Sequence, residues 1–94
     1  MTIAQEIERI LRANLNITDL TIINESHLHA GHTGDNGTGE SHFRVIIASD
    51  SFAGLTRVAQ HQKIYALLSD LLKTKIHALA IESSIPAGFQ FRGD

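Results

Sequence analysis

The 94-residue sequence contains no cysteine, has a single proline and lacks any strong excess of basic residues. Without cysteine, the chain can form no disulfide and can supply no thiolate ligand to a metal. No apolar run reaches the roughly 18 residues needed to span a bilayer. The N-terminus carries Glu6 and Glu8 and lacks the basic stretch of a signal peptide. The net charge of −2 argues against a nucleic-acid-binding domain. We therefore expect a complete, soluble, cytoplasmic protein whose residues 1–94 form one domain.

The apolar pattern predicts a helix followed by two strands in the first half of the chain. Thr2 and Gln5 have the spacing of a capping box, and apolar residues then recur at helical intervals. This predicts an amphipathic helix over residues 2–14. Strands are predicted over Leu20–Glu25 and over His42–Ser49, where apolar residues alternate. The two strands and the polar stretch between them indicate a hairpin with a long loop.

The second half of the chain predicts helical structure and then a third strand. The pattern is helical from Leu55 to Lys73, and residues 55–60 are a candidate for a separate short helix. The apolar segment Ile76–Ile81 predicts the third strand, and Pro86 is expected to end regular structure. Because helical structure separates the second and third strands, we expect them to pair in parallel. The sequence thus predicts an α+β fold of order α-β-β-α-α-β, with a three-stranded mixed sheet and helices on one face.

The long loop, residues 26–41, is rich in glycine and histidine. Loops longer than roughly 12 residues in compact domains usually have a functional reason. His29 and His32 are candidate metal ligands, since imidazole binds zinc, copper, nickel and iron. A closed structural zinc site needs four ligands, however, so spacing alone favours a solvated polar loop. His27 and His42 flank the strand ends, and we expect them to be solvated or to take part in strand pairing.

His77 is a different case, because it lies within the apolar third strand. A buried imidazole there needs a hydrogen-bond partner or a functional role. A lone strand histidine is more often structural, but the start of the strand can face the same rim as the loop. No catalytic set is present: there is no cysteine nucleophile, no serine lies in a G-x-S-x-G context, and nothing pairs Glu25 with Glu40. We therefore expect no enzymatic activity.

Five blocks of residues, taken in order and with their spacing, resemble the BolA family. They are Asn24-Glu25-Ser26-x-x-His29, Glu40-Ser41-His42-Phe43-x-Val45, Phe52-x-Gly54, His61-x-x-Ile64-Tyr65 and His77-Ala78-Leu79-Ala80. The match extends over some two-thirds of the chain, from the first strand to the third. The resemblance implies a class II KH-like fold.

The resemblance also implies a partner and a cofactor. BolA proteins pair with monothiol glutaredoxins and share a [2Fe–2S] cluster with the glutaredoxin cysteine and glutathione. The family's histidine ligand corresponds to His77, and the second ligand corresponds by spacing to His29, with His32 as a close competitor. If the partner and glutathione supply two thiolates, this chain need supply only two nitrogens, which agrees with its lack of cysteine.

The family has also been linked to DNA binding and transcriptional control, so a KH-like nucleic-acid-binding regulator is the alternative. Candidate contacts are Arg57, His61 and Lys63. Many members carry Arg-His-Arg where this chain has Gln60-His61-Gln62, and the missing cations argue against this role. His61 is instead expected to pack a helix onto the sheet. The GXXG match Gly31-His-Thr-Gly34 lies between two strands, whereas KH domains place that loop between helices. A metal carrier that acts without a protein partner is a third interpretation.

Overall fold

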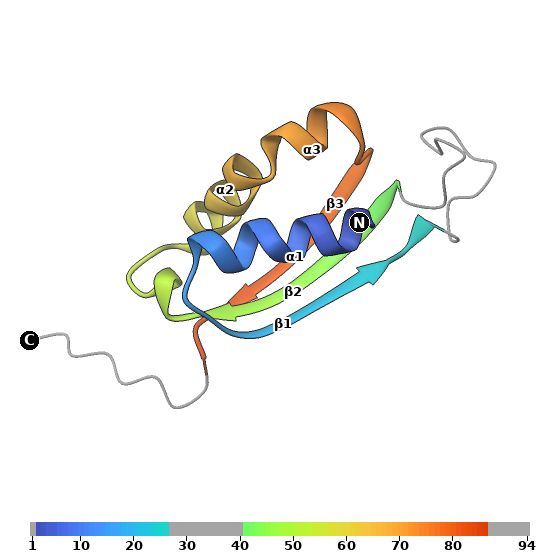
Figure 1. Ribbon diagram of the computed structural model, residues 1–94. Helices are drawn as coiled ribbons and strands as arrows, with labels where there is room; N and C mark the ends of the chain where they lie inside the picture. The colour runs from blue at the N-terminus through green and yellow to red at the C-terminus, as the bar shows by residue number, and fades with distance from the viewer. Residues whose placement is uncertain (1, 27–40, 87–94) are drawn as a thin grey trace, which may run out of the picture.

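The computed structural model describes residues 2–26 and 41–86. The elements are α1 (Ile3–Asn14), β1 (Ile17–Asn24), β2 (His42–Ser49), the 3₁₀ turn η2 (Asp50–Phe52), α2 (Arg57–Leu67), α3 (Ser69–Thr74) and β3 (Ala78–Ser84). The sheet has the order β1-β2-β3, in which β1 and β2 are antiparallel and β2 and β3 are parallel. The three helices cover one face of the sheet (Figure 1). The predicted α+β fold with a three-stranded mixed sheet is confirmed.

The first helix begins at the predicted capping box. The Thr2 hydroxyl accepts a hydrogen bond from the Gln5 backbone N–H at 3.1 Å, and the Gln5 side-chain oxygen accepts one from the Thr2 N–H at 2.8 Å. These two bonds satisfy amide groups that have no partner within the helix itself. Ile7 and Leu11, one turn apart, are completely buried against the sheet. Local capping and an apolar stripe therefore account for α1.

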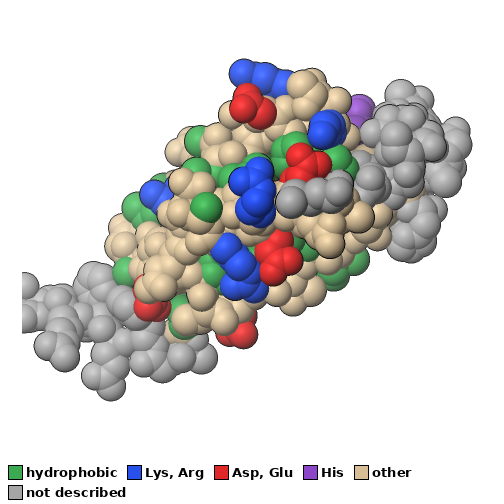
Figure 2. All heavy atoms as spheres, viewed as in Figure 1, with side chains coloured by type: hydrophobic (Ala, Val, Ile, Leu, Met, Phe, Trp, Pro, Cys, Tyr) green, Lys and Arg blue, Asp and Glu red, His purple; other side chains and the backbone are tan. Residues whose placement is uncertain are grey.

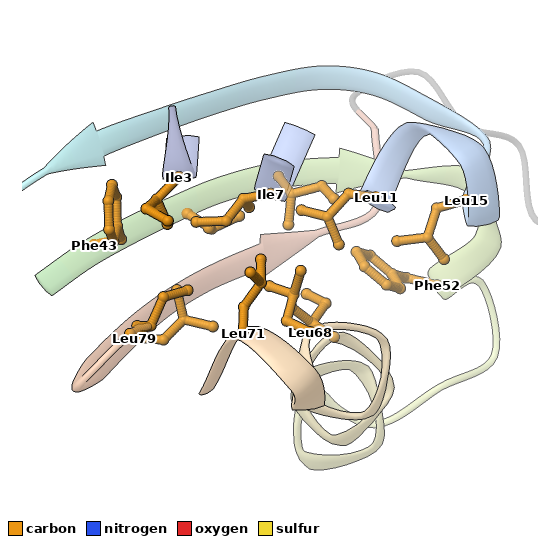
Figure 3. Close-up of a cluster of buried hydrophobic side chains, with 13 residues drawn as sticks. Ile3, Ile7, Leu11, Leu15, Phe43, Phe52, Leu68, Leu71 and Leu79 are labelled. Carbon is orange, nitrogen blue, oxygen red and sulfur yellow. The ribbon is translucent and has the colours of Figure 1, made fainter. Parts of the chain in front are cut away.

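Strand β2 is the centre of the sheet and carries the expected alternation. Phe43, Val45 and Ile47 are buried on the helix-covered face, whereas Arg44 and Ile46 lie on the opposite face. The side chains that form the core come from all three helices, the sheet and η2 (Figure 3). They are Ile3, Ile7, Leu11, Leu15, Phe43, Val45, Ile47, Phe52, Ile64, Leu68, Leu71, Ile76 and Leu79. A single layer of apolar side chains thus fixes the helices on the sheet.

The predicted hairpin is present, with somewhat different strand ends. β1 begins at Ile17 and ends at Asn24, whereas the sequence predicts a strand over Leu20–Glu25. Its last residue, Asn24, pairs with Phe43 of β2. The paired part of the hairpin therefore ends two residues before Ser26 on one strand and two residues after Ser41 on the other. Residues 27–40 lie outside the described part of the chain.

The helical region divides at a different residue from the one predicted. A separate helix over residues 55–60 is wrong: α2 begins after Thr56, whose hydroxyl accepts from the Ala59 N–H at 3.1 Å, and runs to Leu67. The division lies at Leu68, which is completely buried. The Leu68 N–H still donates to the carbonyl of Ile64 at 3.0 Å. Periodicity misses this division, because apolar spacing continues through Leu68 into α3.

The third strand begins and ends later than predicted. The sequence predicts Ile76–Ile81, whereas β3 runs over Ala78–Ser84. Ile76 is buried in the core, but its N–H donates to the carbonyl of Leu71 at 2.8 Å and so closes the end of α3. β3 then continues through polar residues, because its backbone pairs with β2. The expected parallel pairing is confirmed. No helix among residues 2–26 and 41–86 is long and apolar enough to cross a membrane.

Candidate functional site

His77 lies at the end of the sheet where β1 ends and where β2 and β3 begin (Figure 1). Because the long loop connects β1 and β2 here, we call this end of the strands the loop-bearing edge. Its backbone N–H donates to the carbonyl of Ser41 at 2.8 Å, and the Ala78 N–H approaches the same oxygen at 3.3 Å. His77 directly precedes β3 and its side chain is exposed, so the predicted position within the strand is wrong. The expected location at the loop-bearing rim holds, because Ser41 is the first described residue after the loop. In the same view, Figure 2 shows a histidine side chain at this end of the molecule.

His42, the first residue of β2, is the nearest described imidazole to His77. The two ring centroids are 5.2 Å apart and the ring planes are inclined by 46°. Only 6% of the surface of His42 is exposed, so the expectation that it is solvated is wrong. The alternative, that it takes part in strand pairing, is confirmed, because His42 pairs with Ala78 of β3. Its Nδ1 lies 2.7 Å from the Ser41 hydroxyl oxygen. The ring is therefore held from one side by a hydroxyl group and contacts His77 on another.

Ser26 ties the two ends of the loop together. Its hydroxyl oxygen accepts hydrogen bonds from the backbone N–H groups of Ser41, at 2.8 Å, and His42, at 3.1 Å. The Glu25 N–H donates to the His42 carbonyl at 2.8 Å. Ser26, Ser41 and His42 are all buried. Sequence reasoning assigned no role to the two serines, although each lies in a sequence block that flanks the loop.

The other candidate ligands, His29 and His32, lie outside the described residues, as does His27. Within the described part, no group of three or more histidine, cysteine, aspartate or glutamate side chains could hold a metal ion. His42 and His77 form a pair only. Of the two, His77 is the exposed one, and its imidazole is a nitrogen donor of the kind that binds iron or zinc.

The candidate nucleic-acid contacts lie at a different place, beside β3, which is an outer strand of the described sheet. Arg57 and His61 line an open cleft of about 390 Å³ together with Ile46, Ile81, Glu82, Ser83 and Ser84. Lys63 is exposed and does not line this cleft. His61 is half-buried, in line with a packing role, but its Nε2 is buried and has no hydrogen-bond partner among the described residues. The structure therefore brings two of the three candidates together.

An ion-pair bridge crosses the helix-free face of the sheet. The Arg44 guanidinium lies 2.9 Å from the carboxylate of Glu25, which follows β1, and 2.9 Å from that of Glu82 in β3. The hydrogen bond and charge of Glu25, followed by those of Glu82, raise the pKa of Arg44 above its ordinary value. Sequence reasoning assigned no function to Arg44. The bridge connects β2 with β3 and with the residue that follows β1, near the edge that carries His77.

Comparison with known proteins identifies the family. The profile of the BolA-like protein family matches residues 11–87. A protein of Haemophilus influenzae named DNA-binding transcriptional regulator BolA is 41% identical over 86 residues, covering 92% of this chain and 80% of the relative. The solved structure of BolA1 from Arabidopsis thaliana is 36% identical, with a TM-score of 0.83, over 96% of this chain and 98% of that chain. The BolA domain of SufE1 from the same plant is 38% identical, with a TM-score of 0.80, over 92% and 94% of the two chains. The chain therefore belongs to the BolA family.

Proposed function

We propose that this chain pairs with a monothiol glutaredoxin and shares a [2Fe–2S] cluster with it, in iron–sulfur cluster handling or iron sensing. The observation that carries the proposal is the exposed imidazole of His77 at the loop-bearing edge of the sheet. An exposed ligand at an edge is accessible to a second protein. In this role the chain binds and releases a cluster in the cytoplasm and catalyses no reaction itself.

The donor chemistry supports sharing. The chain has no cysteine, so thiolates must come from the glutaredoxin and from glutathione. Imidazole replaces thiolate in Rieske-type clusters, where two histidines on one iron raise the reduction potential. A neutral imidazole carries no charge, whereas a thiolate carries a negative one, so the mixed ligand set lowers the net negative charge of the cluster.

The second ligand in this proposal is His29, with His32 as the alternate. Ser26 is fixed by hydrogen bonds from the N–H groups of Ser41 and His42, and the Ser41 carbonyl in turn accepts the N–H of His77. His29 follows Ser26 by three residues, and three residues of fully extended chain span at most about 10 Å. His32 is six residues from Ser26, which allows up to about 20 Å. The shorter tether favours His29.

The test is to reconstitute the cluster with a monothiol glutaredoxin, glutathione, iron and sulfide, and to record visible circular dichroism. We expect His77→Ala to remove the heterodimer spectrum, and His29→Ala to weaken it. The double variant of His29 and His32 should lose the spectrum as His77→Ala does. His61→Gln, which alters a histidine far from this edge, is the matched control. An unchanged spectrum for both His77→Ala and the double variant would falsify the ligand assignment.

Calorimetry distinguishes this proposal from a metal carrier that acts alone. The isolated chain is titrated with zinc in the absence of glutaredoxin and glutathione. Because the proposed site needs the partner's thiolates, we expect only weak binding. Tight stoichiometric binding by the isolated chain, lost in the double variant of His29 and His32, would favour the independent carrier.

Nucleic-acid binding is the second candidate, because relatives from Haemophilus influenzae and Escherichia coli are named DNA-binding transcriptional regulators. Arg57 and His61 line an open cleft in which phosphate could be bound. Against this role, basic and acidic side chains lie intermixed on the face shown in Figure 2. Phosphate contacts release counterions, so this candidate predicts affinity for duplex DNA that falls steeply with salt and is reduced in Arg57→Ala. Fluorescence anisotropy measures both effects, and no binding at low salt eliminates this role.

A further inference from the structure

The side chain of His77 does not lie alone on the surface. Its ring packs at 5.2 Å from the ring of His42, a distance typical of side chains whose flat faces and edges are in contact. His42 is buried, whereas His77 is exposed. A buried ring therefore forms one wall for an exposed ring. The orientation of the His42 ring therefore limits the rotamers that the His77 side chain can adopt.

Ser41 controls both the wall and the backbone of His77. Its hydroxyl oxygen lies 2.7 Å from Nδ1 of His42 and so fixes the rotation of the His42 ring. Its carbonyl accepts the backbone N–H of His77 at 2.8 Å. Ser41 is completely buried, and its own N–H donates to the hydroxyl of Ser26 at 2.8 Å. Ser41 is thus bonded both to the His77 main chain and to the ring against which the His77 side chain packs.

We propose that Ser41 and His42 are positioning residues, which hold the His77 imidazole in the orientation in which it binds the shared cluster. This inference rests on the proposed function, in which His77 is a ligand. A metal-binding histidine is normally oriented by an outer partner, and loss of such partners typically weakens metal binding 10- to 100-fold. Here the orienting contacts are the hydrogen bond between the Ser41 hydroxyl and His42 and the ring contact between His42 and His77.

The test compares two buried serines at opposite ends of β2. Ser41→Ala removes the hydroxyl that holds His42. Ser49→Ala removes an equally buried hydroxyl, which donates to the Asn16 carbonyl at 2.7 Å, and leaves the His77 edge intact. His42→Phe is a second variant, which keeps a ring in the buried position and removes the ring nitrogens. It serves as the perturbation if Ser41→Ala does not fold.

Two readouts are needed, one of them without any cluster. In the isolated proteins, nuclear Overhauser contacts between the ring protons of residue 42 and those of His77 report the ring orientation. We expect their relative intensities to change in Ser41→Ala and in His42→Phe, where no bond between a hydroxyl and Nδ1 holds the ring at position 42, and to persist unchanged in Ser49→Ala. In the reconstituted heterodimer, we expect Ser41→Ala to lose its cluster to a chelator at least about tenfold faster than Ser49→Ala.

The outcomes separate this inference from the function on which it rests. If His77→Ala abolishes the heterodimer spectrum while Ser41→Ala retains both the wild-type ring contacts and the wild-type release rate, positioning is refuted and the ligand role stands. If His77→Ala leaves the spectrum unchanged, the proposed function fails. A change in the ring contacts together with faster release, in Ser41→Ala but not in Ser49→Ala, supports the positioning role.

Discussion

The hydroxyl of Ser26 provides a direct test of how the loop-bearing edge of the sheet is stabilised. Ser26→Ala removes the acceptor of two hydrogen bonds, from the N–H groups of Ser41 and His42. Each such bond contributes about 1 kcal/mol net, and a buried N–H left without its acceptor adds a desolvation penalty. Ser41 is completely buried, so water does not readily replace the lost oxygen. We expect the free energy of unfolding to fall by roughly 2–3 kcal/mol in total.

Urea denaturation followed by far-ultraviolet circular dichroism measures this change. For a domain of this size, the loss corresponds to a decrease of roughly 10–20 °C in the melting temperature. Ser84→Ala is the matched control: Ser84 is an exposed residue of β3, and we expect its removal to change stability by less than about 0.5 kcal/mol. If Ser26→Ala is as mild as Ser84→Ala, the loop ends are not held by this hydroxyl and the reasoning is wrong.

Three further predictions address the core, the cluster and the ion-pair bridge. Leu11→Ala, at a completely buried core position, should lower the unfolding free energy by about 2–5 kcal/mol in urea titrations, and a loss below 1 kcal/mol would contradict the packing of α1. The heterodimer spectrum should fade as the pH is lowered, because histidine binds a metal only through a neutral imidazole; a spectrum independent of pH argues against histidine ligands. Arg44→Gln should reduce the melting temperature more at low salt than at high salt, because its partners Glu25 and Glu82 are partly exposed and screened by ions; equal losses would contradict an electrostatic role.

The elements that local rules determine could be predicted from the sequence. The capping box of Thr2 and Gln5 marks the start of α1, and the alternation in β2 indicates its buried face without any long-range information. The errors occur where tertiary contacts decide. The division at Leu68 follows from its burial in the core, and the last residues of β3 are polar and extend the strand only because β2 pairs with them.

The candidate site, too, could be predicted only where local sequence features indicate it. His77 could be singled out by its residue type, its apolar context and the resemblance to the BolA family. The contacts among Ser26, Ser41 and His42 could not, because they depend on the register in which the hairpin closes. A shift of that register by one residue would turn the side chains of β2 to the opposite faces of the sheet. It would also separate the Ser26 hydroxyl from the two backbone N–H groups whose hydrogen bonds it accepts.

The location of His77 depends ultimately on the direction of one strand. β2 starts where the loop ends, and β3 runs parallel to it, so the start of β3 lies beside the start of β2. An antiparallel third strand would have placed its first residue beside η2, at the far end of the sheet from the loop. The crossover through α2 and α3 makes the parallel arrangement possible, since parallel neighbours need a long connection. The helices therefore do more than cover the core: they return the chain to the edge at which His77 and the residues flanking the loop meet.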